Sequence, residues 1–367
     1  MNRQTVTALL GKRDVPTDAV EQYCRYLGAA LQSHDFQLEI RRVPWEIHGW
    51  RDALKALHLE AAAWGGRWVL VQYTALAWSS RGFPLKFLRV LKILKSAGAR
   101  IAIVFHDSEP FRGPRLVHRL RTRVQLHIMR RALAAADLAI FTLSPEKISW
   151  LAGSSSRAHF IPVGPNLPIP MPPENVLSRA HLTSGTPTIG VFTITGGEPG
   201  AREAKIILAA VRHAAQKVGK LHLSVFGRHA ELRETTLREG LKDLPVEISA
   251  EGVLDDQQVI ERLRAADVLL FVRGAITTGR SSAIVGIACG VPMIAYVGKQ
   301  TAWPITDAGV LLVTPGNLDE LHDALVRVLS EPELRASLRR CSNHVYREHL
   351  SWPAIAIRFA ALFKSPE

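Results

Sequence analysis

Residues 277–296 read TTGRSSAIVGIACGVPMIAY, and this stretch combines a helix, a turn and a strand. The apolar run after Ser282 is typical of a buried helix. Gly-Val-Pro at 290–292 ends that run, because glycine and proline terminate helices. The MIAY that follows has the character of a short buried strand. A helix that leads directly into a buried strand is typical of parallel sheets, so we predict an α/β fold.

The start of this helix, Gly279 to Ser282, has two interpretations. In the structural one, a serine is the N-cap, because its hydroxyl satisfies backbone N–H groups of the first turn. In the functional one, small residues beside Arg280 at a helix start form a phosphate site. These residues alone leave both interpretations open.

The second half of the chain repeats this strand–helix alternation, which predicts a complete doubly wound domain. The predicted strands lie in 187–195, 221–227, 246–252, 267–274, 291–298 and 309–315. The predicted helices span about 201–217, 229–242, 255–265 and 317–330, besides the one that starts near Ser281 and a last one at 352–364.

The first half alternates in the same way, and a proline-rich segment separates the halves. Its predicted strands lie in 68–76, 99–107, 137–144 and 159–164. Residues 162–187 contain seven prolines and two glycines, so no long regular element fits there. We therefore predict a first Rossmann-like domain at 1–168, a linker at 169–187, a second Rossmann-like domain at 188–348 and a final helical segment at 349–367.

Composition limits the class of protein. The 367 residues are 47% hydrophobic, enough for about two domains with their own cores. No apolar run reaches the roughly 18 residues that span a bilayer, and the first residues lack a secretion signal. Three widely spaced cysteines (Cys24, Cys289 and Cys341) indicate a reducing cytoplasm and no metal site. The net charge of +13 favours anionic partners, namely nucleic acid, acidic lipids or phosphorylated small molecules.

In open α/β sheets ligands bind beyond the carboxyl ends of the strands, so residues that follow strands are the site candidates. In the second domain they combine glycines, hydroxyls and basic side chains, which suits a diphosphate. They are Thr193, Thr195, Gly196, Gly197, Gly227, Arg228, Arg273, Gly274, Thr277, Gly279, Arg280, Ser281 and Ser282, with Arg202 and Lys205 on the first helix. The chain has no GxxxxGK[ST] motif and no GxGxxG after an early strand, which disfavours a P-loop hydrolase and a dinucleotide dehydrogenase.

In the first domain, His106, Asp107 and Glu109 follow a predicted strand. Imidazole and carboxylate groups commonly move hydroxyl protons, although Asp107 could equally cap a turn. The sequence Gly11-Lys12-Arg13 precedes a helix capped near Thr17 or Asp18, and it is a candidate binding loop or a plain connection. Tyr73 and Thr74, which follow the apolar stretch WVLVQ (68–72), are further candidates.

A basic helix is expected around 114–131. Seven arginines and no acidic residue lie between Arg112 and Arg131, and Arg115, Arg119 and Arg123 share one stripe. Beside it runs an apolar stripe of Leu116, Leu120, Val124 and Ile128. Such a surface suits an anionic membrane, a solvated helix face or nucleic acid. The chain has no zinc knuckle or RNA-recognition signature, so we predict no nucleic-acid partner.

Taken together, these segments resemble the GT-B glycosyltransferases, in particular the group-1, family-four-like class that uses nucleotide sugars. The resemblance lies in LSVFGR (223–228), EGVLDDQQVIERLRAADVLLFVRG (251–274), AIVGIACGVPMIAY (283–296) and AGVLLVTPGNLDELHDALVRVL (308–329). It implies two Rossmann-like domains that face each other across a cleft, with the tail 349–367 crossing back onto the first.

The resemblance also implies the activity: transfer of a sugar, without a bound metal, from a nucleotide-diphosphate sugar of the UDP or GDP type. The second domain would bind the donor. Gly11, Lys12, Arg13 and Tyr73 of the first would bind a glycan or lipid-linked acceptor, with His106 beside the transferred sugar. We expect a cytoplasmic enzyme of surface polysaccharide or glycoconjugate synthesis, peripheral on the inner membrane face.

One departure from the family concerns its pair of donor-side glutamates, which have seven residues between them. Thr277 and Val285 stand at those positions, and Gly279–Ser282 occupy the diphosphate loop. The resemblance implies retention of anomeric configuration, whereas inversion would require a base such as Asp107 or Glu109. The loss of the glutamates also leaves an alternative, a catalytically inactive GT-B protein that acts as a binding or partner subunit.

Overall fold

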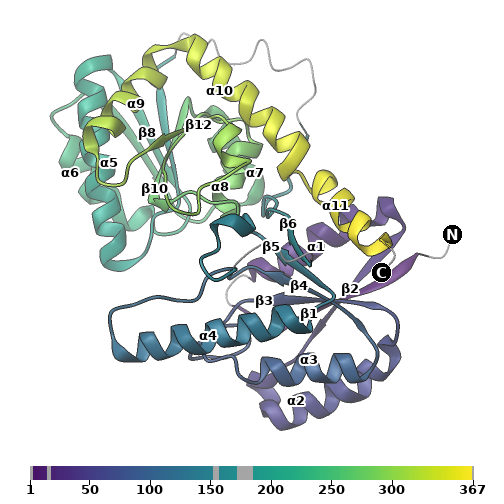
Figure 1. Cartoon of the computed structure of the whole chain (residues 1–367). Coiled ribbons are helices and arrows are strands. Elements are labelled where there is room, and N and C mark those ends of the chain that lie inside the picture. Colours follow the sequence, from purple (N-terminus) through teal and green to yellow (C-terminus); the bar gives the residue numbers. More distant parts are fainter. Residues whose placement is uncertain (1–2, 15–17, 152–156, 172–184, 366–367) are drawn as a thin grey trace. The chain divides into compact units, whose positions relative to one another are not determined.

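The computed structural model describes residues 3–14, 18–151, 157–171 and 185–365 (Figure 1). The chain divides into two compact units. Unit 1 comprises Met1–Asn166 together with Trp352–Glu367, and unit 2 comprises Leu167–Ser351. Most of the linker predicted at 169–187, namely residues 172–184, lies outside the described residues.

Unit 1 is built on a six-stranded parallel sheet in the order β2-β1-β3-β4-β5-β6. Its strands are β1 (Gln4–Leu10), β2 (Phe36–Arg42), β3 (Trp68–Tyr73), β4 (Arg100–Phe105), β5 (Leu138–Phe141) and β6 (Ala158–Phe160). Its helices are α1 (Ala19–Leu31), α2 (Trp45–Ala61), α3 (Phe87–Ser96), α4 (Leu116–Ala135) and α11 (Trp352–Lys364).

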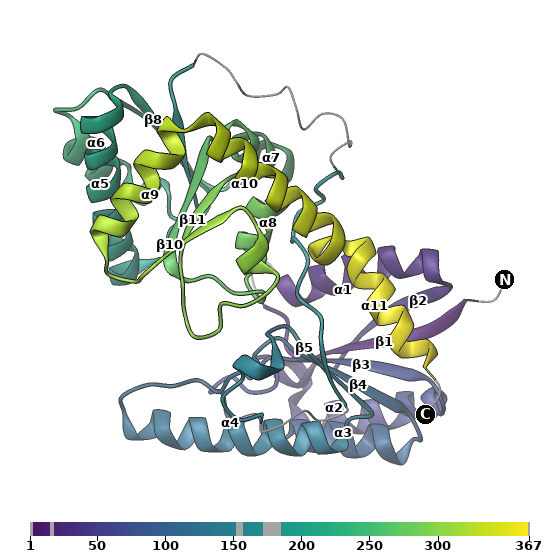
Figure 2. The same ribbon diagram turned by 45° about the horizontal axis from the view of Figure 1, so that its top comes forward.

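Helices cover both faces of this sheet, which explains why its central strands are nearly continuous apolar runs. All six residues of β3 are buried. Helices α2, α3 and α4 lie along one face, where their apolar side chains form a buried core cluster. Helices α1 and α11 lie on the other face (Figure 2). The last helix belongs to unit 1: Nε1 of Trp68 donates to the carbonyl of Phe363 at 3.1 Å, and Trp352 stacks on Tyr26.

Unit 2 has a second six-stranded parallel sheet, in the order β12-β11-β10-β7-β8-β9. Its strands are β7 (Thr188–Phe192), β8 (Leu221–Phe226), β9 (Val246–Glu251), β10 (Val268–Ala275), β11 (Met293–Tyr296) and β12 (Val310–Val313). Its helices are α5 (Gly197–Val218), α6 (Glu234–Leu241), α7 (Asp256–Ala265), α8 (Ser281–Ala288), α9 (Leu318–Ser330) and α10 (Pro332–Val345). Helices α5, α6 and α9 pack on the face formed by Val268, Leu270 and Val272.

The predicted α/β fold with two doubly wound parallel sheets is therefore confirmed. Several boundaries differ. Helix α5 begins at Gly197, before the predicted 201, because Pro199 falls in its first turn, where its missing N–H costs nothing. The strand predicted at 68–76 ends at Tyr73. Helix α10 has no counterpart among the predicted elements.

Among the described residues, no helix combines the length and the apolar character needed to cross a membrane. In the same part of the chain, no three His, Cys, Asp or Glu side chains gather in a way that could hold a metal ion.

A stacked histidine pair makes the stability of unit 2 depend on pH. The rings of His213 on α5 and His322 on α9 lie 4.5 Å apart and nearly parallel. Burial and then the neighbouring His213 lower the pKa of His322, whereas Asp319 and Asp323 act in the opposite direction. A histidine with a lowered folded-state pKa binds its proton less well in the folded than in the unfolded state.

The free energy of unfolding is therefore expected to fall as the pH is lowered from 7 through the ordinary histidine pKa of about 6.5. In His322→Gln this fall should be smaller, because the variant cannot charge at this position. Urea unfolding at a series of pH values measures both slopes. Equal slopes in the two proteins would show that the pair does not titrate on folding.

Candidate functional site

The carboxyl end of the unit 2 sheet gathers a polar cluster around Arg273 at the end of β10. The guanidinium of Arg273 donates from Nη1 to Oγ1 of Thr193 at 2.6 Å and from Nη2 to Oγ of Ser282 at 2.5 Å. Arg280 donates from Nη1 to the carbonyl of Arg273 at 3.1 Å. Residues from three different segments, after β7, in β10 and at the start of α8, therefore meet at one point.

This cluster concentrates positive charge. Burial lowers the pKa of Arg273, and the nearby Arg280 and Arg228 lower it further, against the opposing effect of Glu203. Burial also lowers the pKa of Arg280. Both guanidiniums stay protonated at neutral pH. In the described part of the chain neither arginine forms an ion pair, so the cluster is suited to an anion with several acceptor oxygens.

The backbone around the cluster is tightly packed, which explains its glycines. A Cβ at Gly200 would lie 1.7 Å from the carbonyl oxygen of Thr195, and one at Gly227 would lie 2.8 Å from Cγ2 of Thr193. Gly274 has a positive φ of 92°, and its face is covered by the Arg280 guanidinium. Gly196 is the N-cap of α5, and no side chain there binds the first-turn N–H groups.

The structure answers the question of how α8 starts. Its N-cap is Arg280, whose side chain makes no capping bond, and Ser281 is the first helical residue. The hydroxyl of Ser282 accepts from Arg273. The interpretation of a serine N-cap is therefore wrong, and the serine hydroxyl serves the arginine cluster.

The structure does not bring all predicted donor residues to this cluster. Arg202 and Lys205 are exposed on α5, and Arg202 pairs with Glu198 at 2.7 Å. Their neighbour Glu203 is buried instead and accepts from the N–H of Thr195 at 2.8 Å. The helical phase decides this, since residues two positions apart on a helix point in different directions. Arg228 and Gly279 are exposed, whereas Thr277 and Ser281 are half-buried.

In unit 1, a cavity of about 320 Å³ opens at the carboxyl ends of β1, β3 and β4. The predicted loop of Gly11, Lys12 and Arg13 lines it together with Asp107. The candidate Thr74 also lines it, as do Ser80 and Asp18, which were not predicted to do so. Gly11 is required by packing, because a Cβ there would lie 2.3 Å from the carbonyl oxygen of Ala77.

Asp107 is the titratable group from the strand end that reaches this cavity. Its Oδ2 accepts from the N–H of Ala75 at 2.7 Å. Burial raises the pKa of Asp107, and the bond from Ala75 acts in the opposite direction. The carboxylate thus lies where a hydroxylated ligand can donate to its remaining lone pairs.

His106 and Glu109 are engaged elsewhere and are not among the cavity-lining residues. Nε2 of His106 bonds to Oε1 of Gln72 at 2.8 Å, and its ring lies edge-on to Tyr23. Burial lowers the pKa of His106 to about 4, so the imidazole is neutral at pH 7. Glu109 accepts from the N–H and, at 2.7 Å, the hydroxyl of Ser149, and it faces Arg112 at 3.4 Å.

The prediction that Tyr73 binds the acceptor does not agree with the position of its side chain. Its side chain is fully buried between Phe87 and Phe105, so it is a core residue and is not among the residues that line the cavity. The strand ends at Tyr73 with its side chain on the core face, and Thr74, the next residue, turns to the cavity instead.

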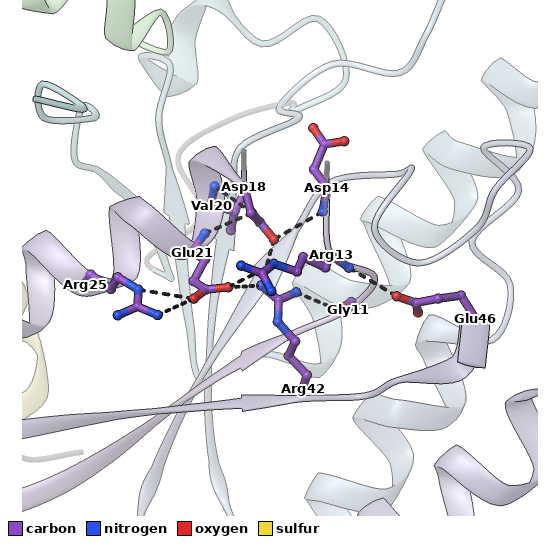
Figure 3. Close-up of polar contacts among 9 residues, drawn as sticks. All are labelled: Gly11, Arg13, Asp14, Asp18, Val20, Glu21, Arg25, Arg42 and Glu46. Carbon is purple, nitrogen blue, oxygen red and sulfur yellow. Dashed lines mark hydrogen bonds and ion pairs between the residues drawn. The ribbon is translucent and has the colours of Figure 1, made fainter. Parts of the chain in front are cut away.

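Sequence reasoning missed Arg42, at the end of β2, which joins the two ends of the cavity loop (Figure 3). Its Nη1 donates to the carbonyl of Gly11 at 3.1 Å, and its Nη2 donates to Asp18 at 2.7 Å and to Glu21 at 2.5 Å. Asp18 in turn caps α1 by accepting from the N–H groups of Val20 and Glu21. No spacing pattern points to this arginine, since its partners are 21 to 31 positions away in the chain.

Replacing Arg42 with methionine is expected to lower the free energy of unfolding by about 2 kcal/mol, because two carboxylates lose a charged, largely buried donor. Arg25→Met is the matched control, since among the described residues Arg25 pairs with Glu21 alone and it is mostly exposed, so its loss should be below about 1 kcal/mol. Denaturant unfolding measures both. Equal effects would contradict the role assigned to Arg42.

The basic helix predicted at 114–131 is α4, and Arg115, Arg119 and Arg123 are exposed on it. Its apolar stripe is packed only in the second half: Ile128 is fully buried, whereas Leu116 is 80% and Leu120 56% exposed. The first half of α4 therefore presents apolar and cationic side chains together to the surroundings.

Comparison with known proteins identifies the fold. No protein-family model matches the sequence. Solved structures match along the whole chain: Anabaena Alr3699/HepE, determined with UDP and glucose, is 15% identical with a TM-score of 0.65, covering 99% of this chain and 100% of that one. Sucrose-phosphate synthase from Thermosynechococcus elongatus is 19% identical with a TM-score of 0.65, covering 99% and 98%. The chain has the GT-B fold.

A curated relative matches over a shorter range. The GDP-mannose-dependent monoacylated alpha-(1-6)-phosphatidylinositol monomannoside mannosyltransferase of Corynebacterium glutamicum is 29% identical over 140 residues. The match covers 36% of this chain and 36% of that protein, so the chain matches about a third of the length of this relative.

Proposed function

We propose that the protein is a glycosyltransferase that moves a sugar from a nucleotide-diphosphate sugar to a glycan or glycolipid acceptor. The observation that carries this proposal is the cluster in which Arg273 bonds to Thr193 and Ser282 and Arg280 bonds to Arg273, with no ion pair from either arginine to a carboxylate among the described residues. The similarity to a protein determined with UDP and glucose, and to a mannosyltransferase that depends on GDP-mannose, supports it. The donor is of the UDP or GDP type.

In this proposal the leaving diphosphate binds at the arginine cluster. Arg273 and Arg280 neutralise the charge that develops on it, so the reaction needs no bound metal. The hydroxyls of Ser282 and Thr193 hold Arg273 in place. Gly196 and Thr195 bring the N-terminus of α5 and its N–H groups to the same edge. Arg228, Thr277, Gly279 and Ser281 flank the cluster in sequence, and Arg202 and Lys205 contribute only through long, exposed side chains.

The acceptor binds in the cavity of unit 1, between Lys12 and Arg13 at the loop and Asp107 at the strand end. Its hydroxyl donates to the Asp107 carboxylate. The curated relative acts, by its name, on a phosphatidylinositol mannoside, which supports a lipid-linked glycan as the acceptor class. Such an acceptor belongs to surface polysaccharide or glycoconjugate synthesis.

We propose that transfer proceeds with retention, as the resemblance implies, with a phosphate oxygen of the leaving diphosphate taking the acceptor proton. His106 is neutral and bonded to Gln72, and Glu109 is bonded to Ser149, so neither is available as a base in this structure. Of His106, Asp107 and Glu109, Asp107 is the residue that can serve as the general base if the enzyme instead inverts the anomeric configuration.

We also propose a cytoplasmic protein that associates peripherally with the inner membrane face. The exposed half of α4 supports this, because Leu116 and Leu120 can enter an interface while Arg115, Arg119 and Arg123 contact anionic headgroups. A lipid-linked acceptor would be reached at such a surface.

The test begins with thermal stabilisation by UDP, GDP, ADP, CMP and dTDP, since a ligand at about 100 times its dissociation constant adds roughly 2.7 kcal/mol. The corresponding nucleotide sugars are then incubated with membrane extracts, and labelled lipid or glycan product is measured. Selective stabilisation and transfer by one nucleotide type is the expected result. Binding without turnover would identify an inactive GT-B subunit, and no stabilisation by any nucleotide would overturn the donor site.

A further inference from the structure

A second groove lies on unit 1, away from the cavity at the strand ends. It runs between α3 and α4, has a volume of about 490 Å³, and includes residues from the last turn of each helix, Ser96 and Ala135. Helices α3 and α4 lead into β4 and β5, so these last turns are next to the amino ends of the strands. The groove is therefore separate from the candidate acceptor site.

The lining of this groove combines cations with an apolar floor. Arg89, Lys92, Lys95 and Arg131 line it, and all four are exposed. None of them forms an ion pair with a described residue. Leu88 and Ala135, both half-buried, provide apolar surface between them, whereas Leu91 in the same lining is buried in the core. In the sequence from Lys86 to Ala135, the only acidic residues are Asp107 and Glu109, both in the loop after β4.

Stabilisation of the helices does not account for this arrangement. Lysines and arginines in the last turn of a helix interact favourably with its dipole, and this explains the position of Lys95 in α3. Arg89 and Lys92 lie earlier in α3, and with Lys95 they form a stripe at spacings of three residues. Like charges at such spacing repel one another and destabilise a helix. A bound anion would relieve this repulsion.

We propose that the groove between α3 and α4 binds the phosphate headgroups of anionic phospholipids. Charge complementarity selects an anion, and the apolar floor selects an amphiphile. The same helix α4 exposes Leu116, Val117 and Leu120, which suit a lipid surface and have no counterpart in a polar nucleic-acid ligand. The inference rests on the proposed peripheral association with a membrane, and it does not depend on sugar transfer.

The test is cosedimentation of the full chain with vesicles of phosphatidylcholine alone or mixed with phosphatidylglycerol. We expect binding only to the mixed vesicles. The triple variant Arg89→Gln, Lys92→Gln, Arg131→Gln should bind them roughly 100-fold more weakly, since each basic residue near an anionic surface contributes about a factor of five. Glutamine preserves helix propensity, so the helices should be retained.

The matched control is Lys217→Gln, Lys220→Gln, Lys242→Gln, which removes the same charge from exposed positions of unit 2. It should bind mixed vesicles nearly as the wild type does. Equal loss of vesicle binding in both triple variants, or equal binding of the wild type to both vesicle types, would refute the groove as a lipid-binding site. If the wild type did not bind mixed vesicles but bound millimolar inorganic phosphate or single-stranded RNA in solution, and the groove variant lost that binding, the site would belong to that ligand instead.

Thermal unfolding and nucleotide stabilisation of the groove variant keep this test separate from the proposed function. Nucleotide stabilisation should match the wild type, because the groove residues lie in unit 1 and the arginine cluster lies in unit 2. The variant should unfold at or above the wild-type temperature, because removing like charges relieves their repulsion. A protein that binds no nucleotide but still shows the groove-dependent lipid binding would refute the transferase proposal and leave this inference standing.

Discussion

Arg273→Ala is expected to weaken binding of the nucleoside diphosphate by about 10- to 100-fold. The guanidinium is a largely buried cation held by Thr193 and Ser282, and hydrogen bonds from charged groups contribute roughly 1.5–3 kcal/mol each. Isothermal titration with the nucleotide that stabilises the wild-type protein measures the loss. Arg280→Ala should reduce affinity in the same direction, because this cation lies beside Arg273.

Two variants control this prediction. Arg202→Ala removes an exposed cation that is paired with Glu198, so its affinity should stay within about threefold of the wild type. Arg273→Lys keeps a charge but cannot bridge two hydroxyls, so it should fall between the wild type and the alanine variant. If Arg202→Ala lost more affinity than Arg273→Ala and Arg280→Ala, the donor diphosphate would have to be placed on α5.

Asp107→Asn is expected to lower kcat/KM for the acceptor by about 10- to 100-fold while leaving nucleotide affinity unchanged. The carboxylate lines the proposed acceptor cavity, and an amide would replace a charged acceptor of the substrate hydroxyl by a neutral one. Steady-state transfer to membrane extract, titrated at saturating donor, gives the acceptor parameters. Glu109→Gln is the control, because Glu109 contacts Ser149 and does not line the cavity.

The size of the loss in kcat/KM of Asp107→Asn also helps to distinguish retention from inversion at the anomeric carbon. A general base contributes about 10²- to 10⁴-fold, so a loss above about 1000-fold together with an inverted anomeric product would make Asp107 the base of an inverting enzyme. Proton NMR of the first product determines the anomer independently. A change below about threefold would remove Asp107 from the acceptor site altogether.

The pH dependence of transfer should not follow His106. Burial lowers its pKa to about 4, so it stays neutral over the range in which the protein is folded and active. Burial raises the pKa of Asp107, so activity that depends on its ionised form should be lost as the pH falls towards that pKa.

The predictability of the site differed between the two units. The sequence pointed to Arg273, Arg280 and Ser282 because they follow a strand or open a helix, and in parallel sheets all such positions meet at one edge. It pointed equally to Arg202 and Lys205, which are exposed on α5. Side-chain direction depends on where a helix starts and which face it buries, and the early start of α5 at Gly197 was not predicted.

What the sequence by itself determined is the alternation of strands and helices in both halves, and hence two doubly wound α/β domains. The GT-B arrangement came from the family resemblance of its motifs, and β1, β2, α2 and α10 were not predicted. Buried parallel strands need apolar runs, crossover helices need an apolar stripe, and both patterns are local. The tertiary structure alone decided that Tyr73 is core, that Asp107 rather than Glu109 reaches the cavity, and that Arg42 closes its loop. These outcomes depend on contacts between residues far apart in the chain, such as Arg42 with Gly11. Such contacts are fixed by packing of whole elements, and no local spacing of residue types encodes them.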